Sequence, residues 1–158
     1  MVVYRIERGK YLKTTLTGIG ASMSKGYRWN SFNTKLVYTD ESRALAMLEV
    51  SVHLDLSEDL PTDRYYVEIE IPKKITIQEV KIEDLPEDWN ANPPTITTQT
   101  IGDDFVYQNE SAILKVPSSI VPQEFNYLIN PNHPDVKKIK VIGKTSMNFD
   151  TRLKIKKS

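Results

Sequence analysis

Alternating apolar and polar residues predict several β-strands along the chain. In the clearest one, residues 65–71, four largely apolar side chains at odd positions alternate with Tyr66, Glu68 and Glu70. Pro72 ends this strand, because proline lacks the N–H that a strand ladder uses. The same pattern predicts strands at residues 2–7, 36–39, 75–82 and 111–116, and a final hairpin of 136–142 with 145–149 around Gly143-Lys144.

A single helix is predicted from Glu41 to about Leu54. Leu45, Leu48 and Val52 recur at helical spacing, and an acidic segment before them suits the positive end of a helix dipole. One helix among several strands favours an α+β fold with a mixed sheet over alternating βαβ units. Residues 85–94 hold three prolines and are expected to form a long structured loop. The 158 residues fit one domain, residues 1–158.

Composition narrows the classes of function. Twenty-one Lys and Arg balance twenty-one Asp and Glu, which disfavours a generic nucleic-acid coat protein. The chain has no Cys and only His53 and His133, so we expect no disulfide, no thiol nucleophile and no metal centre. No apolar run approaches the roughly 18 residues of a membrane span, and the N-terminus has no signal pattern. A cytoplasmic location without membrane contact is therefore expected.

Glu49 falls on the apolar stripe of the predicted helix, four residues after Leu45. Burying a carboxylate costs free energy unless the group is paired or faces a cleft. In one interpretation, Glu49 lies at the margin of the stripe and reaches solvent or pairs with His53 one turn later. In the other, it lies on the floor of a pocket and stabilises charge or hydrogen-bonds a substrate. The spacing leaves both open.

Arg28 and Tyr38 are the other candidates for chemistry. Arg28 stands between Tyr27 and Trp29 after a glycine-containing loop, and its guanidinium suits bidentate recognition of phosphate. A surface cation–π pair with Trp29 is the alternative. Tyr38 lies in the short strand before the helix, so it can share a cleft with Glu49, or it is an ordinary core tyrosine.

Several segments between Tyr4 and Leu153 resemble, in order and spacing, the RES domain, a family named for its Arg, Glu and Ser. The segments are Gly18-Ile19-Gly20-Ala21, Gly26-Tyr27-Arg28-Trp29-Asn30, Val37-Tyr38, residues 46–54, Gly102-Asp103, residues 111–118, residues 124–131, His133-Pro134 and residues 150–153. The resemblance implies the toxin of a bacterial type II toxin–antitoxin pair, with a compact mixed-sheet fold similar to ADP-ribosyltransferases. It also implies an enzyme that consumes NAD by phosphorolysis, by hydrolysis or by passing ADP-ribose to a protein, and thereby arrests growth.

The resemblance also assigns residues. It places the family's arginine, tyrosine, glutamate and serine at Arg28, Tyr38, Glu49 and Ser111, and a further NAD-contacting arginine at Arg5. Arg28, Tyr38 and Glu49 are then catalytic, while the arginines, Tyr38 and Ser111 bind NAD. A role in strand capping is the alternative for Ser111. NAD is a substrate, with phosphate as co-substrate for phosphorolysis, and no cofactor or metal is expected.

The implied partner is an Xre-like antitoxin that blocks the NAD cleft and supplies the only link to DNA; a homodimer stays open. Two departures from the family pattern affect the pocket rim: Tyr27 replaces a glycine, and the usual Pro and Gly are absent from residues 31–35. One rival hypothesis is a toxin-like RNA-binding protein or ribonuclease, which the basic residues 137–157 and the aromatic rings beside Arg28 would suit. A solvated edge explains the same basic tail. The other rival is a non-catalytic binding module.

Overall fold

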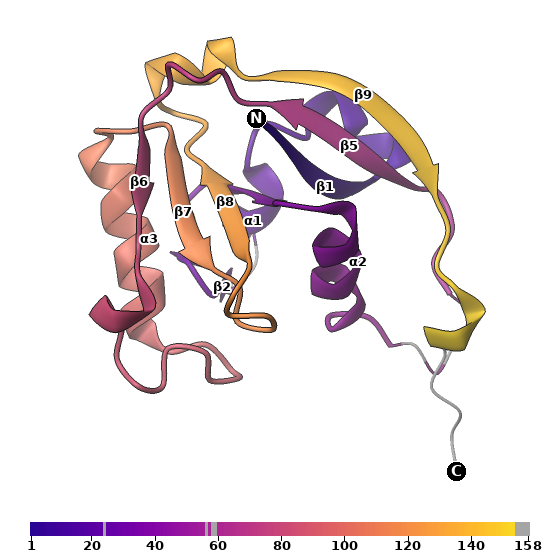
Figure 1. The fold of residues 1–158 in the computed structure, drawn as a ribbon, viewed down its shortest axis with the longest axis horizontal. Helices are drawn as coiled ribbons and strands as arrows, with labels where there is room; N and C mark the ends of the chain where they lie inside the picture. The colour runs from indigo at the N-terminus through magenta and orange to yellow at the C-terminus, as the bar shows by residue number, and fades with distance from the viewer. Residues whose placement is uncertain (24, 56, 58–59, 154–158) are drawn as a thin grey trace.

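The frame of the computed structural model, which describes residues 1–158 except 24, 56, 58–59 and 154–158, is a seven-stranded mixed sheet (Figure 1). The strand order is β6-β7-β8-β4-β1-β5-β9, and β6 and β7 form its parallel pair. The strands are β1 (Val2–Arg8), β4 (Val37–Asp40), β5 (Arg64–Glu70), β6 (Ile77–Glu79), β7 (Ile113–Pro117), β8 (Phe125–Ile129) and β9 (Lys140–Met147). The predicted α+β class with a mixed sheet is confirmed.

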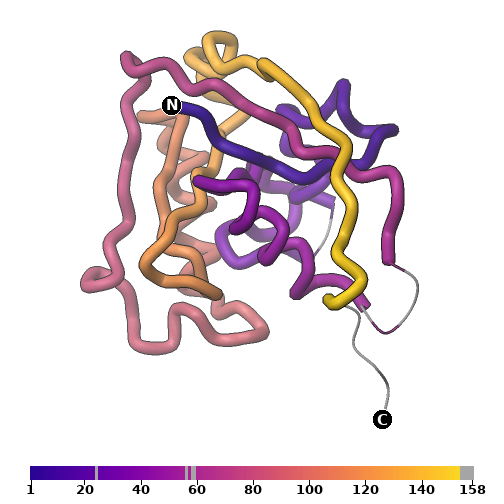
Figure 2. Tube along the Cα trace, turned by 45° about the vertical axis from the view of Figure 1, so that its right-hand side comes forward, coloured from indigo at the N-terminus to yellow at the C-terminus, as the bar shows by residue number. Residues whose placement is uncertain are grey.

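The sheet is divided between β4 and β1. These two strands pair at one position, Tyr4 with Asp40, whereas β1 pairs with β5 over seven residues and β4 with β8 over four. Figures 1 and 2 accordingly show β6, β7 and β8 on one side and β1, β5 and β9 on the other. Beyond this one pairing position β1 and β4 are not joined as a ladder, and the Arg5 side chain of β1 instead contacts the backbone of β4 there.

Helices and a small second sheet complete the fold. The helices are α1 (Ile19–Met23), α2 (Arg43–Ser51), α3 (Ile96–Gln108) and the 3-10 turns η1 (Gly9–Thr14), η2 (Ile82–Asp84), η3 (Pro134–Lys138) and η4 (Thr151–Leu153). Strands β2 (Gly26–Tyr27) and β3 (Asn30–Ser31) form the small sheet. None of the described helices is long and apolar enough to cross a bilayer.

Two apolar cores lie on opposite faces of the main sheet. One is built on strand residues such as Val37, Ile69 and Ile129, and 3-10 helix η1 packs against it through Leu12. The other gathers around Trp29 and includes residues of β7, β8 and α3. Gly102 of α3 permits the close approach, because a Cβ there would meet the Trp29 carbonyl oxygen at 1.6 Å. This contact fixes the β2–β3 turn, which carries Arg28, against α3.

Several sequence predictions need correction. Helix α3 and strand β8 were not predicted, and the helix expected at 41–54 spans residues 43–51, with Ser42 as its N-cap. The predicted final hairpin is wrong: 140–147 is one strand, and its register against β5 shifts between Glu68 and Ile69. Gly143 lies opposite Glu68 beside that bulge, so it marks an irregularity within a strand rather than a turn. The basic tail is described to residue 153, and its residues 154–157 lie outside the described part.

Candidate active site

Glu49 is held by hydrogen bonds from two other elements. Its Oε1 accepts from the Ser118 hydroxyl at 2.7 Å and from the Asn126 amide at 3.1 Å. The same hydroxyl accepts the backbone N–H groups of Ile120 and Val121 at 3.1 and 3.2 Å. Because these two donors occupy its lone pairs, the hydroxyl proton is directed at Glu49. The carboxylate is therefore fixed between helix α2 and the ends of β7 and β8.

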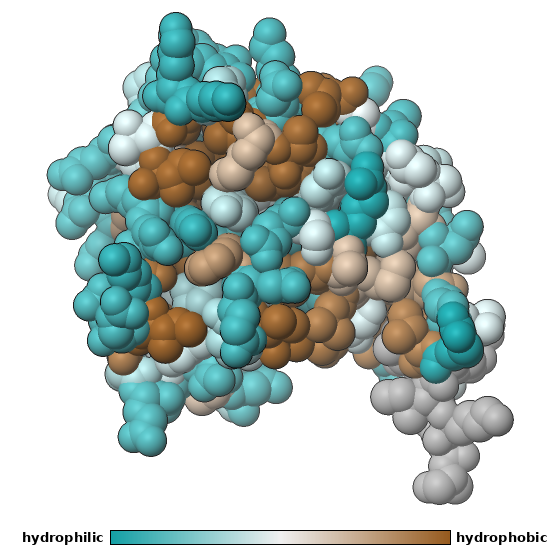
Figure 3. All heavy atoms as spheres, in the orientation of Figure 1, coloured by the Kyte–Doolittle hydropathy of each residue, from teal (hydrophilic) through white to brown (hydrophobic). Residues whose placement is uncertain are grey.

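The helix does not bury the stripe that the sequence suggested. Leu45 is buried, but Leu48 is 38% exposed and Val52 is 56% exposed. Figure 3 shows apolar surface in the region where α2 lies, among polar residues. Glu49 is half-buried on the side of α2 that faces the sheet, and the described structure contains no ion pair between Glu49 and His53. The groups that contact Glu49 are polar side chains from the sheet and its ends, so the predicted apolar stripe does not determine the position of Glu49.

A second carboxylate shares Asn126 with Glu49. The Asn126 amide nitrogen also donates to Oδ1 of Asp40 at 2.6 Å, and Asp40 is buried at the end of β4. Burial and, next, the charge of Glu49 raise the pKa of Asp40 to about 7, while the Asn126 hydrogen bond and the Arg5 charge act in the opposite direction. The Asn126 amide therefore lies between Glu49 and a carboxyl group that is largely neutral below pH 7.

Arg28 lies at the β2–β3 turn and is fixed by the loop after η2. One terminal nitrogen, Nη1, donates to the backbone carbonyls of Trp89 and Ala91, both at 2.9 Å. Trp29 is buried in the core around it, so the guanidinium points to these carbonyls and not over the Trp29 ring. Burial lowers the pKa of Arg28, and the charge of Glu49, which lies near enough to interact, opposes that shift.

Tyr38 links its strand to the turn that carries Arg28. Its hydroxyl donates to Oδ1 of Asn30 at 2.7 Å and accepts the backbone N–H of Trp29 at 3.1 Å. Burial raises the pKa of Tyr38, so the phenol stays neutral. The ring lies partly against the core around Trp29, and the hydroxyl orders the turn. Tyr38 is thus more than a core residue, because its polar end fixes the backbone next to Arg28.

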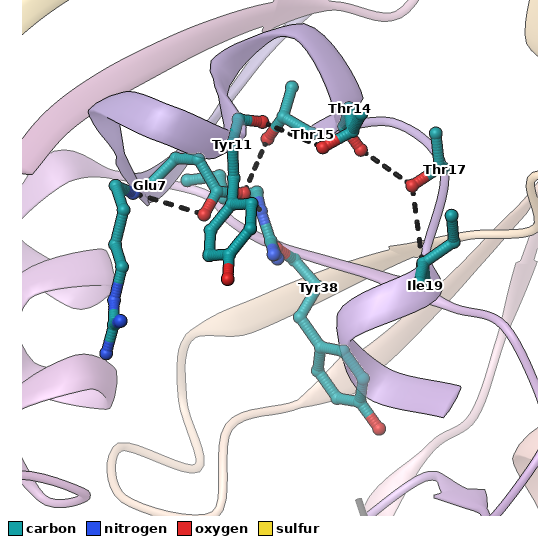
Figure 4. Close-up of polar contacts among 9 residues, drawn as sticks. Glu7, Tyr11, Thr14, Thr15, Thr17, Ile19 and Tyr38 are labelled. Carbon is teal, nitrogen blue, oxygen red and sulfur yellow. Dashed lines mark hydrogen bonds and ion pairs between the residues drawn. The ribbon is translucent and has the colours of Figure 1, made fainter. Parts of the chain in front are cut away.

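Arg5 bridges the two halves of the sheet. Its Nη1 donates to the Tyr38 carbonyl at 3.0 Å and its Nε donates to Glu7 at 3.1 Å. Glu7 is buried and also accepts the Thr15 hydroxyl at 3.0 Å. Figure 4 shows Thr15 directed at Glu7, and the Tyr38 ring pointing away from Glu7. The divergence of β1 from β4 gives Arg5 the space to reach Tyr38.

The structure does not bring Ser111 into this group. Its hydroxyl donates to the carbonyls of Thr76 and Ile113 before the start of β7. Since a strand rises about 3.3 Å per residue, Ser111 and Ser118 stand roughly 20 Å apart at opposite ends of β7. The serine beside Glu49 is Ser118. Its place directly after Pro117, which ends a predicted strand, was the available signal in the sequence.

The predicted residues Arg5, Arg28, Tyr38 and Glu49 thus come together, and Asp40, Ser118 and Asn126, which the sequence did not single out, join them. Two hollows of the surface lie elsewhere. One, of about 370 Å³, is lined by residues that include Lys35, Asp103 and Tyr107. The other, of about 260 Å³, lies around Phe125. Neither lining includes Arg28 or Glu49. The candidate site is therefore identified by its cluster of charged residues and not by the size of a cavity.

Residues 2–151 match the model of the RES domain. The chain belongs to the RES domain family. It is 41% identical over 145 residues to the Prs ADP-ribosylating toxin of Sphingobium sp. strain YBL2, which covers 90% of this chain and 89% of that protein. It is 38% identical over 154 residues to Toxin Res of Photorhabdus laumondii, covering 97% of each chain. Toxin Res of Yersinia enterocolitica is 36% identical over 156 residues, or 98% of this chain and 100% of that protein.

The fold of this RES-domain chain also matches a solved structure. A chain of the M. tuberculosis MbcT–MbcA toxin–antitoxin complex is similar with a TM-score of 0.74, covering 92% of this chain and 83% of that one. The identity is 13%, so this likeness shows a shared fold. The family model and the relatives named as toxins, which match nearly the whole chain, confirm the family and the toxin class that the sequence predicted.

The Asp40–Glu49 pair predicts a pH-dependent effect on stability. Because the pKa of Asp40 is raised from 3.8 to about 7, the folded protein keeps a proton that the unfolded chain has already lost between these two values. The folded state therefore loses stability as pH rises from 3.8 to about 7, and the loss is complete above 7. Asp40→Asn removes that charge and keeps an acceptor for Asn126. Urea unfolding should therefore show the variant gaining on the order of 2–4 kcal/mol relative to wild type between pH 5 and pH 8.5. An equal difference in unfolding free energy between variant and wild type at both pH values would contradict this. Asp88→Asn, on an exposed loop, is the control and should show no such pH dependence.

Proposed function

We propose that this RES-domain toxin breaks the bond between nicotinamide and ribose in NAD. The observation that carries the proposal is the half-buried Glu49 carboxylate, fixed by Ser118 and Asn126 and near enough to Arg28 for the two charges to interact. A relative with 41% identity is named an ADP-ribosylating toxin, and transfer of ADP-ribose requires that this bond break. The acceptor at the ribose carbon is phosphate, water or a protein side chain.

Cleavage of this bond develops positive charge on the ribose while nicotinamide leaves with the bonding electron pair. A carboxylate that is already oriented stabilises that charge without reorganising, which is the role proposed for Glu49. Ser118 and Asn126 hold the carboxylate in place and, because they are neutral donors, leave its charge intact. The acceptor then forms the new bond to the same carbon. When phosphate is the acceptor, it arrives as an anion, so Glu49 does not have to act as a general base.

The two arginines supply positive charge for the pyrophosphate. Arg28 uses Nη1 on the loop carbonyls, and within the described residues no hydrogen bond occupies its Nε or Nη2. Arg5 is anchored by Glu7 and by the Tyr38 carbonyl, and its side chain is 25% exposed. A guanidinium fixed in this way binds phosphate oxygens with little loss of side-chain freedom. Tyr38, which stays neutral, offers its ring to the nicotinamide.

Incubation of the purified protein with NAD, with and without phosphate, followed by mass spectrometry of the products, tests this function. Nicotinamide should appear, and the partner product identifies the acceptor. Glu49→Gln keeps acceptors for Ser118 and Asn126 but loses the charge, so turnover should fall about 100- to 1,000-fold, roughly 3–4 kcal/mol, in a folded variant. Glu70→Gln, on the exposed side of β5, should turn over normally. Intact NAD together with cleaved RNA in the same tube would instead favour the ribonuclease hypothesis.

The same site suggests how the toxin is restrained. The structural neighbour is described as part of a toxin–antitoxin complex. The proposal for this chain is an Xre-like antitoxin that covers the cleft and places a carboxylate against Arg5 and Arg28, because fixed arginines bind carboxylates as well as phosphates. NAD and the antitoxin should therefore compete in a binding assay. Unchanged NAD affinity in the presence of saturating antitoxin would mean that inhibition acts at a distance.

A further inference from the structure

Three aromatic rings from separate elements meet at Tyr27, the residue before Arg28. The ring centroid of Tyr27, at the end of β2, lies 5.6 Å from that of Tyr38 on β4, with the ring planes tilted by 59°. On its other side, Tyr27 lies 6.5 Å from the His53 ring, which follows α2, in an edge-on arrangement of 76°. Tyr27 is therefore the central ring of the three.

Tyr27 contributes little to the folded core. It is 39% exposed, and it belongs to neither of the two core clusters, although Tyr38 packs against one of them. Its backbone is held independently of the ring, since its carbonyl accepts from Gln99 of α3 at 3.1 Å and its strand pairs with Asn30. A large aromatic side chain that is fixed in position and left partly open can serve as a surface for a ligand ring.

The position of Tyr27 relates it to the charged groups. Tyr27 is the residue before Arg28, and Tyr38, which it contacts, hydrogen-bonds the N–H of Trp29 directly after Arg28. His53, whose ring Tyr27 also contacts, follows Glu49 by four residues in the chain. A dinucleotide whose pyrophosphate lies on the arginines and whose ribose lies at Glu49 therefore has its base within reach of these rings.

The nicotinamide ring of NAD is planar and carries a positive charge. The corresponding ring of NADH is neutral, and so is the nicotinamide that is released when the bond breaks. The faces of aromatic rings attract cations. We propose that Tyr27, together with Tyr38, forms an aromatic wall that selects the oxidised dinucleotide over the reduced one by the charge of its ring. The inference rests on the proposed cleavage of NAD and adds a specificity-determining residue to it. It also explains why the product leaves: the ring loses its charge, and hence part of its attraction to the wall, when the bond breaks.

Binding measurements in the inactive Glu49→Gln background separate this role from catalysis. Calorimetric titration with NAD and with NADH compares Tyr27→Leu and Tyr27→Phe with the parent. The Leu change should weaken NAD binding by about 3- to 30-fold and change NADH binding much less. The Phe change should retain the preference, because its ring face is kept. Tyr107→Leu, at a side chain that is 90% exposed on α3, is the matched control and should alter neither affinity.

Two results would overturn the inference. Equal weakening of NAD and NADH by Tyr27→Leu would make the ring a general contact, and tighter NAD binding would make it an obstruction at the rim. A second measurement needs no change at Tyr27. The 1-methylnicotinamide cation should compete with NAD for the Glu49→Gln protein more strongly than neutral nicotinamide does. The reverse order would also overturn the proposal. Failure of the proposed function itself is recognised separately, because the wild-type protein would then release no nicotinamide.

Discussion

Holding a carboxylate half-buried against the sheet, without neutralising it, is the constraint on which the site depends. Desolvation of Glu49 has to be offset by hydrogen bonds, and here they come from Ser118 after β7 and from Asn126 of β8. Asn126 also binds Asp40 at the end of β4, so three neighbouring strands are tied to helix α2 through one carboxylate. Strands β1 and β4 pair at one position only, and next to it Arg5 of β1 hydrogen-bonds the backbone of Tyr38.

The positively charged side chain of Arg28 is also held in a fixed position. Arg28 is fixed by two carbonyls of the loop after η2, and the turn that carries it is ordered by the Tyr38 hydroxyl and by the close approach of Gly102 to Trp29. The backbone N–H and the hydroxyl of Ser31, at the end of that turn, both bond to Asp103 of α3. Fixed dipoles and charges of this kind stabilise a developing charge without reorganising, which is why they suit a reaction that passes through a cationic ribose.

The sequence predicted most of this site because its residues lie in short, strongly patterned segments. Glu49 stands out as an acid among apolar neighbours, and Arg28 stands between two aromatic residues. Ser118 was missed for a physical reason: serines flank β7 at both ends, and only the pairing of β7 with β8 and the packing of α2 decide which one meets the carboxylate. Helix α3 was missed because β-branched residues, Gly and Asp make up most of it, so tertiary contacts with Trp29 stabilise a segment of low intrinsic helix propensity. Gly143 was taken for a turn because a bulge uses the same residue type.

A double-mutant cycle between Ser118 and Glu49 tests most directly whether the serine acts through the carboxylate. The rate of nicotinamide release is compared for Ser118→Ala, Glu49→Gln and the double variant, with Ser111→Ala as the control at the other end of β7. Ser118→Ala alone should lower turnover by about 10-fold or more and should have little further effect once the Glu49 charge is gone. Ser111→Ala should leave turnover unchanged. Full additivity of the two losses, or a loss with Ser111→Ala in place of Ser118→Ala, would contradict it.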